Sequence, residues 1–292
     1  MPAPEPPLPR PPALPLSYAR ALLPRPHRAS SVPDRVLGLR AARADPARLA
    51  RYRRLCAFPD PAALPPCYPH LLAFPLTMAL LTARDFPYPP LGLVHTENVV
   101  EQLRPLAADE PLAPRVWATA ARPHPRGTAF EVRAEARDAR GAVVWRASSG
   151  YLHRRGGGAR EPRQPTVDTA AVNSPASGER WELPAALGRR YAAVSGDRNP
   201  IHLHPLTARP FGFRRPIAHG MWSKARALSA LWPTLPDAFA VHVRFLAPVL
   251  LPARPTFAAT AEGRDRTFTL TAEDGRVQLT GTVSPPPAPC LR

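Results

Sequence analysis

Hydrophobic and polar positions along the chain predict an order of elements that occurs twice. In the first half, Asp45 can cap a helix over residues 45–55. A nearly uninterrupted apolar segment at 68–82 then predicts a buried helix, in which Pro75 marks either a kink or the true start. Four runs with strand character follow, at residues 91–103, 115–121, 128–138 and 142–153. The letters DARG at 138–141 predict the hairpin between the last two runs.

The second half repeats this order. A helix is predicted at 184–194, a polar loop follows it, and a second helix is predicted at 219–231. Strand runs then occur at residues 238–246, 256–263, 266–272 and 277–283. The letters EDG at 273–275 predict another hairpin turn. A helix followed by several antiparallel strands is an α+β unit, and its repetition indicates the duplication of a whole domain.

Proline and glycine mark the expected domain boundaries. Residues 1–16 are rich in proline, which fixes φ and removes backbone donors, so we expect a disordered arm with neither a helix nor a central strand. Residues 155–178 are rich in Gly, Pro, Ser and Thr without periodicity, which is typical of a linker. The expected domains are therefore 17–154 and 179–286.

Composition and charge narrow the class of partner. Of the 292 residues, 45% are hydrophobic and 21% are charged, so a packed core is expected. The net charge is +17, and Lys224 is the one lysine among 39 basic residues. Because the arginines are spread along the whole chain, no localised nucleic-acid footprint is predicted. A basic surface favours an anionic partner, such as the phosphates of CoA or an acidic carrier protein.

Cysteine usage and hydropathy indicate a cytoplasmic protein. Cys56, Cys67 and Cys290 form no C-x-x-C pair, so neither a disulfide framework nor a zinc knuckle is expected. No apolar run approaches the roughly 20 residues that a membrane-spanning helix needs. Prolines interrupt the N-terminus before a signal peptide could form.

The chemistry-bearing residues are concentrated between positions 191 and 221. The letters SGD at 195–197 end a helix, with Gly196 suited to a left-handed cap, and Asn199 with Pro200 forces a turn. This turn can bring the carboxylate of Asp197 and the imidazole of His202 toward one point, where the pair can activate a water molecule.

Gly220 is a candidate oxyanion donor. It stands where the second apolar helix begins, so its backbone N–H faces away from that helix in a region of positive dipole potential. A glycine also allows a ligand to approach the backbone closely.

Two ordered motifs carry a resemblance to a known family. The chain contains D-x-N-P-x-H from Asp197 to His202 and G-F-x-x-P-I-x-H-G-M from Gly212 to Met221. This segment resembles the signature of the MaoC-like dehydratases, the R-specific enoyl-thioester hydratases of the hotdog fold. The resemblance implies an α+β fold of two tandem hotdog domains, each a long helix wrapped by an antiparallel sheet, that together form a pseudo-dimer.

The first half departs from the family pattern. It has no D-x-N-P-x-H, and at the site matching His219 and Gly220 it carries His70 and Leu71. The resemblance therefore implies a degenerate first half. In the family members with two hotdog domains, one half keeps the chemistry and the other is degenerate. The degenerate half usually lacks part of its central helix, which makes room for a longer acyl chain.

The resemblance also implies the reaction. It is the reversible addition of water to a trans-2-enoyl thioester, giving an (R)-3-hydroxyacyl thioester of CoA or acyl carrier protein. Asp197 and His202 would be the catalytic pair, Asn199 an orienting residue and Gly220 the oxyanion donor. No metal and no cofactor are implied beyond the CoA or phosphopantetheine that carries the acyl group. A homodimer of two pseudo-dimers is also possible. The residues expected to contact substrate are Ser195, Pro216, Ile217, His219, Met221 and Trp222.

Several alternatives stay open at this level. The chain can be a hotdog acyl-thioesterase, or a non-catalytic partner subunit that binds acyl thioesters. His219 is expected to bond a backbone group rather than to act in catalysis, and His204 is expected to be solvated rather than to form a metal pair with His202. His95 is interpreted as a polar position of a strand in the first half.

Overall fold

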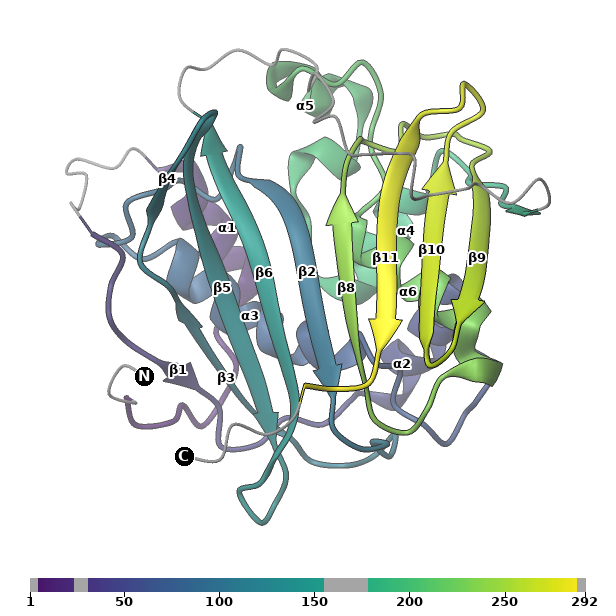
Figure 1. Ribbon diagram of the computed structural model, residues 1–292. Helices are drawn as coiled ribbons and strands as arrows, with labels where there is room; N and C mark the ends of the chain where they lie inside the picture. The colour runs from purple at the N-terminus through teal and green to yellow at the C-terminus, as the bar shows by residue number, and fades with distance from the viewer. Residues whose placement is uncertain (1–4, 24–30, 155–177, 288–292) are drawn as a thin grey trace.

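The first half of the chain folds as a helical segment followed by antiparallel strands (Figure 1). The computed structural model describes residues 5–23, 31–154 and 178–287. The helices of this half are α1 (Leu14–Leu22), α2 (Pro46–Cys56) and α3 (Tyr68–Leu81). Its strands are β1 (Leu37–Gly38), β2 (Val94–Gln102), β3 (Ala113–Ala118), β4 (Arg122–His124), β5 (Gly127–Arg137) and β6 (Val143–Arg154).

The second half contains three α-helices, three short 3-10 helices and five strands within the described residues. The helices are α4 (Leu187–Ser195), η2 (Pro200–His202), α5 (Pro205–Ala208), η3 (Arg209–Phe211), α6 (Gly220–Leu231) and η4 (Trp232–Thr234). The strands are β7 (Glu179–Arg180), β8 (Phe239–Phe245), β9 (Thr256–Glu262), β10 (Asp265–Thr271) and β11 (Val277–Ser284).

These elements confirm most of the sequence pattern. Asp45 caps α2 by accepting a hydrogen bond of 2.7 Å from the Arg48 N–H. Pro75 lies inside α3, so the apolar helix begins at Tyr68 and continues through the proline. The eight predicted strands are present, and both predicted hairpins join antiparallel neighbours, β5 with β6 and β10 with β11.

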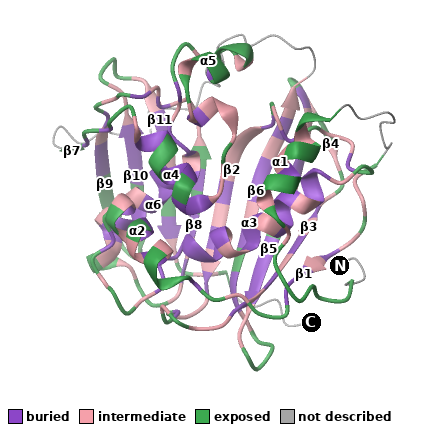
Figure 2. Cartoon of the chain, turned by 180° about the vertical axis from the view of Figure 1, so that it is seen from behind, coloured by how far each residue is buried: buried purple, intermediate pink, exposed green. Residues whose placement is uncertain are grey.

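One continuous sheet joins the two halves. Its strand order is β1-β3-β5-β6-β2-β8-β11-β10-β9-β7, with β4 paired to β5. The junction is the antiparallel pair β2–β8, which runs from Glu97 opposite Arg244 to Gln102 opposite Phe239. Each half contributes the first long strand after its apolar helix, so the two halves meet through equivalent strands. The helices α2, α3, α4 and α6 all lie over one face of this sheet (Figure 2).

A single hydrophobic core extends under the helices of both halves. The buried residues of α2 and α3 belong to the same cluster as those of α4 and α6. Trp222 of α6 donates from Nε1 to the carbonyl of Leu55 in α2 at 3.0 Å, and the rings of Tyr52 and Tyr191 lie 6.2 Å apart across the same boundary. The two halves are therefore held together by side-chain packing as well as by the hydrogen bonds between β2 and β8.

Lys224 connects helix α6 to both strands of this junction. Its side chain, on α6, is fully buried, and Nζ donates to the carbonyl of Asn98 at 3.0 Å, to the Asn98 Oδ1 at 2.6 Å and to the carbonyl of Val241 at 3.1 Å. All three ammonium protons therefore have acceptors, as a buried lysine requires. Because Asn98 is in β2 and Val241 is in β8, one side chain ties the second helix to both central strands.

The prediction of a disordered arm over 1–16 is wrong for residues 5–16. The Leu8 N–H donates to the Gly38 carbonyl at 2.8 Å, and the Leu8 carbonyl accepts from the Arg40 N–H at 3.2 Å, so this segment pairs beside β1. Helix α1 then starts at Leu14. Proline in the first turn of a helix loses no intrahelical bond, so Pro15 is compatible with that start. Proline content therefore does not by itself exclude a helix, because the first N–H groups of a helix need no intrahelical partner.

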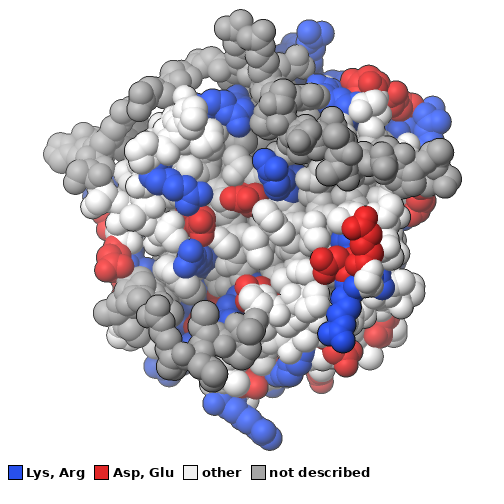
Figure 3. Space-filling model, viewed as in Figure 1, with Lys and Arg blue, Asp and Glu red and all other residues white. Residues whose placement is uncertain are grey.

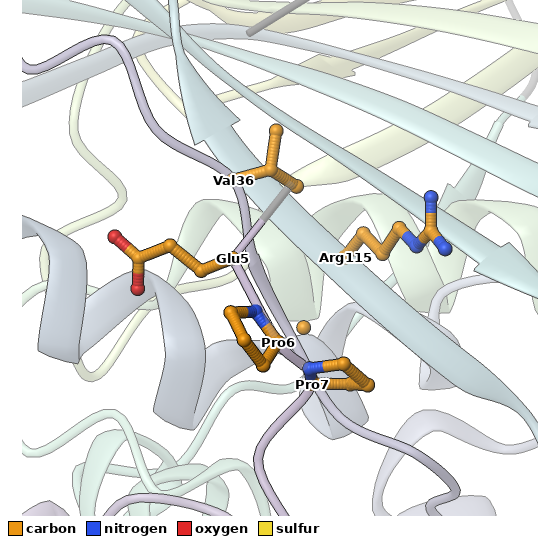
Figure 4. Close-up of a pocket in the computed structure, with 6 residues that line it drawn as sticks. Glu5, Pro6, Pro7, Val36 and Arg115 are labelled. Carbon is orange, nitrogen blue, oxygen red and sulfur yellow. The ribbon is translucent and has the colours of Figure 1, made fainter. Parts of the chain in front are cut away.

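A hollow of about 250 Å³ lies where this segment crosses the edge of the sheet (Figure 4). None of the residues that the sequence singled out for chemistry lines it, so it is separate from the candidate site. Its lining residues are Glu5, Pro6, Pro7, Val36, Gly38 and Arg115.

Two other expectations concern the first half and the linker. A shortened central helix is not found: α3 spans 14 residues and α6 spans 12. The first half is thus degenerate in its motif and not in its helix. The expected linker at 155–178 lies outside the described residues, apart from its last position.

The face of the molecule seen in Figure 3 is mostly uncharged, with acidic and basic side chains scattered over it. On the first-half strands, Glu131 lies 3.2 Å from Arg122 and 3.1 Å from Arg133. The acidic groups thus break up the positive charge on this face. Within the described residues, no helix is both long and apolar enough to cross a membrane.

Candidate active site

The D-x-N-P-x-H segment forms a rigid loop at the end of α4. Gly196 caps the helix with φ of +82°, in the left-handed region that the sequence predicts. The Ser195 Oγ accepts a hydrogen bond of 3.1 Å from the Asp197 N–H. One residue later in the turn, the Asn199 N–H donates to the Asp197 Oδ1, also at 3.1 Å. These bonds fix both the backbone and the carboxylate of Asp197.

The next turn places His202. Asn199 caps the short helix η2, because its Oδ1 accepts from the Ile201 N–H at 3.4 Å and its carbonyl accepts from the His202 N–H at 3.0 Å. Pro200 occupies the first position of η2, where its missing N–H costs nothing. Asn199 therefore orients Asp197 through its backbone and His202 through the helix that it caps.

The second motif sets the tautomer of His202. The His202 Nδ1 lies 2.8 Å from the carbonyl of Ile217, and a carbonyl can only accept, so Nδ1 carries the proton and Nε2 has a free lone pair. Ile217 is itself held, because its N–H donates to the Ile201 carbonyl at 3.0 Å and it bridges to Leu250. The carbonyl of Pro216 accepts from the N–H of the next residue in that segment, Leu251, at 2.8 Å.

His219 lies in the centre of the cluster. Its Nε2 donates to the backbone carbonyl of Asp197 at 3.0 Å and lies 3.8 Å from the Asp197 Oδ2. The ring stacks on His202 with 3.6 Å between centroids and 23° between planes. The expectation that His219 bonds a backbone group agrees with this contact. Its Nδ1 is buried and has no hydrogen-bond partner among the described residues.

Gly220 begins α6 beside this cluster. An N–H in the first turn of a helix has no carbonyl of its own helix to bond, so that of Gly220 is free to act outward. A Cβ at this position would lie 2.8 Å from the Cε1 of Phe245, which is too close for any side chain. The residues on either side, His219 and Met221, are buried, whereas Gly220 itself is half-buried.

Burial and charge set the protonation states. Burial raises the pKa of Asp197, but the nearby rings of His219 and His202 and the Asn199 N–H outweigh it, so the net pKa is lowered. Burial lowers the pKa of His202, against the opposing charge of Asp197, and lowers that of His219 to about 3. At neutral pH the site therefore holds a carboxylate and two neutral imidazoles. The Asp197 side chain remains 33% exposed, so a small molecule can reach it.

The first half contributes two histidines whose interaction with Asp197 the sequence does not predict. His70, at the start of α3, and His95, on β2, both experience the charge of Asp197, although burial is the larger cause that lowers their pKa values to about 4 and about 3. The ring of His95 lies 5.0 Å from Tyr151 and 4.9 Å from Phe245, which covers Gly220. The interpretation of His95 as an ordinary polar strand position is therefore incomplete. A side chain from across the β2–β8 junction gives no local sequence signal.

The other residues singled out by the sequence differ in what their side chains contact. Ser195 is buried and supports the loop through Asp197, and Met221 is buried in the first turn of α6. Trp222 points toward α2, where it bonds Leu55, so the structure gives it a packing role rather than a place beside Asp197. His204 is exposed and caps α5 by accepting from the Leu206 N–H at 3.2 Å.

The same cluster contains the residue types that can bind a metal ion. Asp197, His202 and His219 each offer one ligand atom, and these atoms lie within 4.8 Å of one another. The carbonyls of Ile217 and Asp197 already occupy one nitrogen of each ring, which leaves one free nitrogen per histidine. His204, which the sequence pairs with His202, does not belong to this group.

The fold and this loop together define a dehydratase of the MaoC type. A family model described as the MaoC like domain matches residues 165–283. The 3-hydroxyacyl-thioester dehydratase X of Mycobacterium tuberculosis is 37% identical over 239 residues, which cover 82% of this chain and 84% of that protein. The chain belongs to the MaoC-like dehydratase family, whose members are hydro-lyases.

Solved structures support the same assignment. A crystal structure of HtdX from Mycobacterium tuberculosis superposes with a TM-score of 0.75 at 33% identity, covering 86% of this chain and all of that one. A MaoC-like dehydratase from Phytophthora capsici has a TM-score of 0.63 at 21% identity, covers 84% of this chain and 94% of that one, and shows the shared fold alone. The prediction of an α+β fold of tandem hotdog units is confirmed.

Proposed function

We propose that this protein catalyses the reversible hydration of trans-2-enoyl thioesters to (R)-3-hydroxyacyl thioesters. The observation that carries the proposal is the cluster of a partly exposed carboxylate, Asp197, with the neutral imidazole of His202, at the point where Gly220 begins α6 directly after the clustered His219. The similar 3-hydroxyacyl-thioester dehydratase of Mycobacterium tuberculosis supports this substrate class. The family assignment favours this activity over a thioesterase or a non-catalytic partner subunit.

The water molecule is held between Asp197 and His202. In the hydration direction, the Asp197 carboxylate and the His202 Nε2 accept hydrogen bonds from this water and remove one proton as its oxygen bonds to C3 of the substrate. The same proton, or one exchanged with it, is then delivered to C2, so that water adds across the double bond in the syn sense. Dehydration follows the reverse path through the same groups.

The negative charge that develops passes to the thioester oxygen. Attack at C3 generates an enolate, and the N–H of Gly220 donates to its oxygen at the positive end of α6. One such pre-aimed donor is worth about 3–4 kcal/mol in other oxyanion holes. The carrier is CoA or the phosphopantetheine of an acyl carrier protein, and the proposed steps need no resident metal or cofactor.

The direct test is turnover of a defined substrate. Purified protein is incubated with trans-2-enoyl-CoA esters of short and medium chain length, the loss of enoyl absorbance is followed, and the product is resolved on a chiral column. We expect an (R)-3-hydroxyacyl product, no release of free CoA thiol and unchanged turnover after treatment with a chelator. Esters of acyl carrier protein are tested in parallel, and inactivity on both carriers would contradict the proposal.

Variants locate the chemistry. Asp197→Asn and His202→Ala are each expected to lower kcat by about 10²–10⁴-fold, since general acid–base groups contribute this much. His204→Ala is the matched control, because His204 lies on the same loop but is exposed and caps only α5. Equal turnover by wild type and Asp197→Asn would place the chemistry elsewhere.

A further inference from the structure

One tyrosine of the N-terminal helix reaches the catalytic loop of the other half. The hydroxyl of Tyr18, on α1, accepts a hydrogen bond of 2.6 Å from the Arg198 N–H. Its one proton is shared between two acceptors, the carbonyl of Gly196 at 3.1 Å and the Oδ1 of Asp197 at 3.4 Å. Three consecutive residues of the loop thus meet a single hydroxyl group that is 178 or more positions away in the sequence.

Helix α1 is docked where this contact requires it. Ser17 is buried, and the Cδ1 of Leu14 lies 2.6 Å from the point that a Cβ on Gly196 would occupy. Arg48 of α2 supports the same corner, since its guanidinium donates to the carbonyls of Val194 at 2.6 Å and Ser195 at 3.0 Å. The end of α4, where the carbonyls lack helical partners, is therefore capped by side chains of the first half.

The two oxygens of the Asp197 carboxylate have different surroundings. Oδ1 faces the Tyr18 hydroxyl and accepts from the Asn199 N–H, whereas Oδ2 lies 3.8 Å from the His219 Nε2. A carboxylate anchored through one oxygen cannot rotate freely, so the other oxygen keeps its direction. That second oxygen is the one on the side of the two imidazoles, where the water of the proposed reaction would bind.

We propose that Tyr18 is a positioning residue for the catalytic carboxylate: it fixes the Oδ1 of Asp197 so that Oδ2 is presented to the water. This inference rests on the proposed hydratase activity. It also places part of the active site outside the family-matching segment 165–283, in helix α1 near the N-terminus. Tyr18 does not touch the reacting atoms and acts through Asp197.

The test is the Tyr18→Phe variant, which removes the hydroxyl and keeps the ring. We expect kcat to fall about 10- to 100-fold, since small misplacements of a catalytic group have such effects, while KM stays within about twofold. Arg20→Ala is the matched control on the same helix, because Arg20 is exposed and lies in its last turn. It is expected to behave as wild type.

A pH profile separates positioning from simple loosening of the fold. Asp197 and His202 interact closely, so they take up their first proton as a coupled pair and the acid limb of kcat/KM reports the pair. Losing a donor to Oδ1 makes the carboxylate easier to protonate, so this limb should move to higher pH in Tyr18→Phe. The other groups that interact with the charge of Asp197 are unchanged in the variant, so the shift can be assigned to the phenol. They are His202, His219, His70, His95, Tyr151, Tyr191 and the neighbouring Arg198. The midpoint of thermal unfolding is measured for both variants as the stability control.

The outcomes are distinct. If Asp197→Asn is inactive and Tyr18→Phe matches wild type in kcat and in its acid limb, the positioning role is overturned and the hydratase proposal stands. If kcat falls only together with the unfolding temperature, and the acid limb does not move, Tyr18 is merely structural. If the wild type hydrates no enoyl thioester, the proposed function has failed first.

Discussion

At the scale of single residues, Gly220 is the position where one added methyl group should do most harm. A Cβ there would lie 2.8–3.0 Å from three ring atoms of Phe245 and would narrow the approach to the N–H. We predict that Gly220→Ala lowers kcat/KM by about 10²-fold, because the variant keeps the N–H but the added methyl group displaces the thioester oxygen from it. Gly38→Ala is the control, because its Cβ would meet ordinary contacts of 3.5 Å or more. Full activity of Gly220→Ala would remove this glycine from the mechanism.

The protonation states of the catalytic pair predict an acid limb in the activity profile. His202 must be neutral to accept a proton at Nε2, and burial lowers its pKa below the ordinary value of 6.5. Asp197, whose pKa is also lowered, stays ionised in the same range. We therefore expect kcat/KM to stay constant from pH 8 down through the ordinary histidine pKa of about 6.5 and to fall only at lower pH. Activity that rises as the pH falls through 6 would contradict this assignment.

At the scale of elements, sequence periodicity predicts what is local and misses what is brought together across the junction. The apolar helix at 68–82, the eight strands and the left-handed cap at Gly196 are all local patterns, and they are confirmed. Tyr18 and His95 are different. Their contacts depend on how α1 docks and on the pairing of β2 with β8, which no spacing within either half specifies.

The same β2–β8 junction gives a stability prediction. Lys224→Met would leave the carbonyl and Oδ1 of Asn98 and the carbonyl of Val241 without the donor that they share in the buried seam. Unsatisfied buried acceptors cost about 1–3 kcal/mol each, and methionine regains part of this through packing, so we expect a loss of about 2–4 kcal/mol. Urea unfolding measures it, with the exposed Arg190→Met on α4 as the control. A variant as stable as wild type would show that the seam does not need the lysine.

At the scale of the whole molecule, three histidines are held in their neutral form, of which His219 is buried and His70 and His95 are half-buried. Burial lowers the pKa of His70 to about 4, and those of His95 and His219 to about 3. In the unfolded chain each imidazole binds a proton near its ordinary pKa of about 6.5. Below that pH the unfolded state therefore binds more protons than the folded state, and stability falls as the pH falls.

The predicted size of this effect is large enough to measure in a narrow window. Between pH 6 and 5, the three histidines should each contribute about 1.4 kcal/mol per pH unit, so these three alone make unfolding take up about three protons. His202, whose pKa is also lowered by burial, adds to this uptake. Carboxylates, which titrate mainly near pH 4, contribute little in this window. Burial lowers the pKa of Lys224 to about 7, so between pH 6 and 5 this lysine is charged in both the folded and the unfolded state. It changes the stability only at higher pH. From about pH 7 to 10 the unfolded state binds its proton more tightly, so the free energy of unfolding should rise with pH.

Urea unfolding at pH 6.0, 5.5 and 5.0 checks the slope. His95→Phe should reduce the proton uptake by about one, because it removes one base that resists protonation. His204→Gln, at an exposed position of the catalytic loop, should leave the slope unchanged. A flat dependence in wild type would mean that these histidines bind protons between pH 6 and 5 as readily in the folded state as in the unfolded state. That result would contradict the lowered pKa values of His70, His95 and His219.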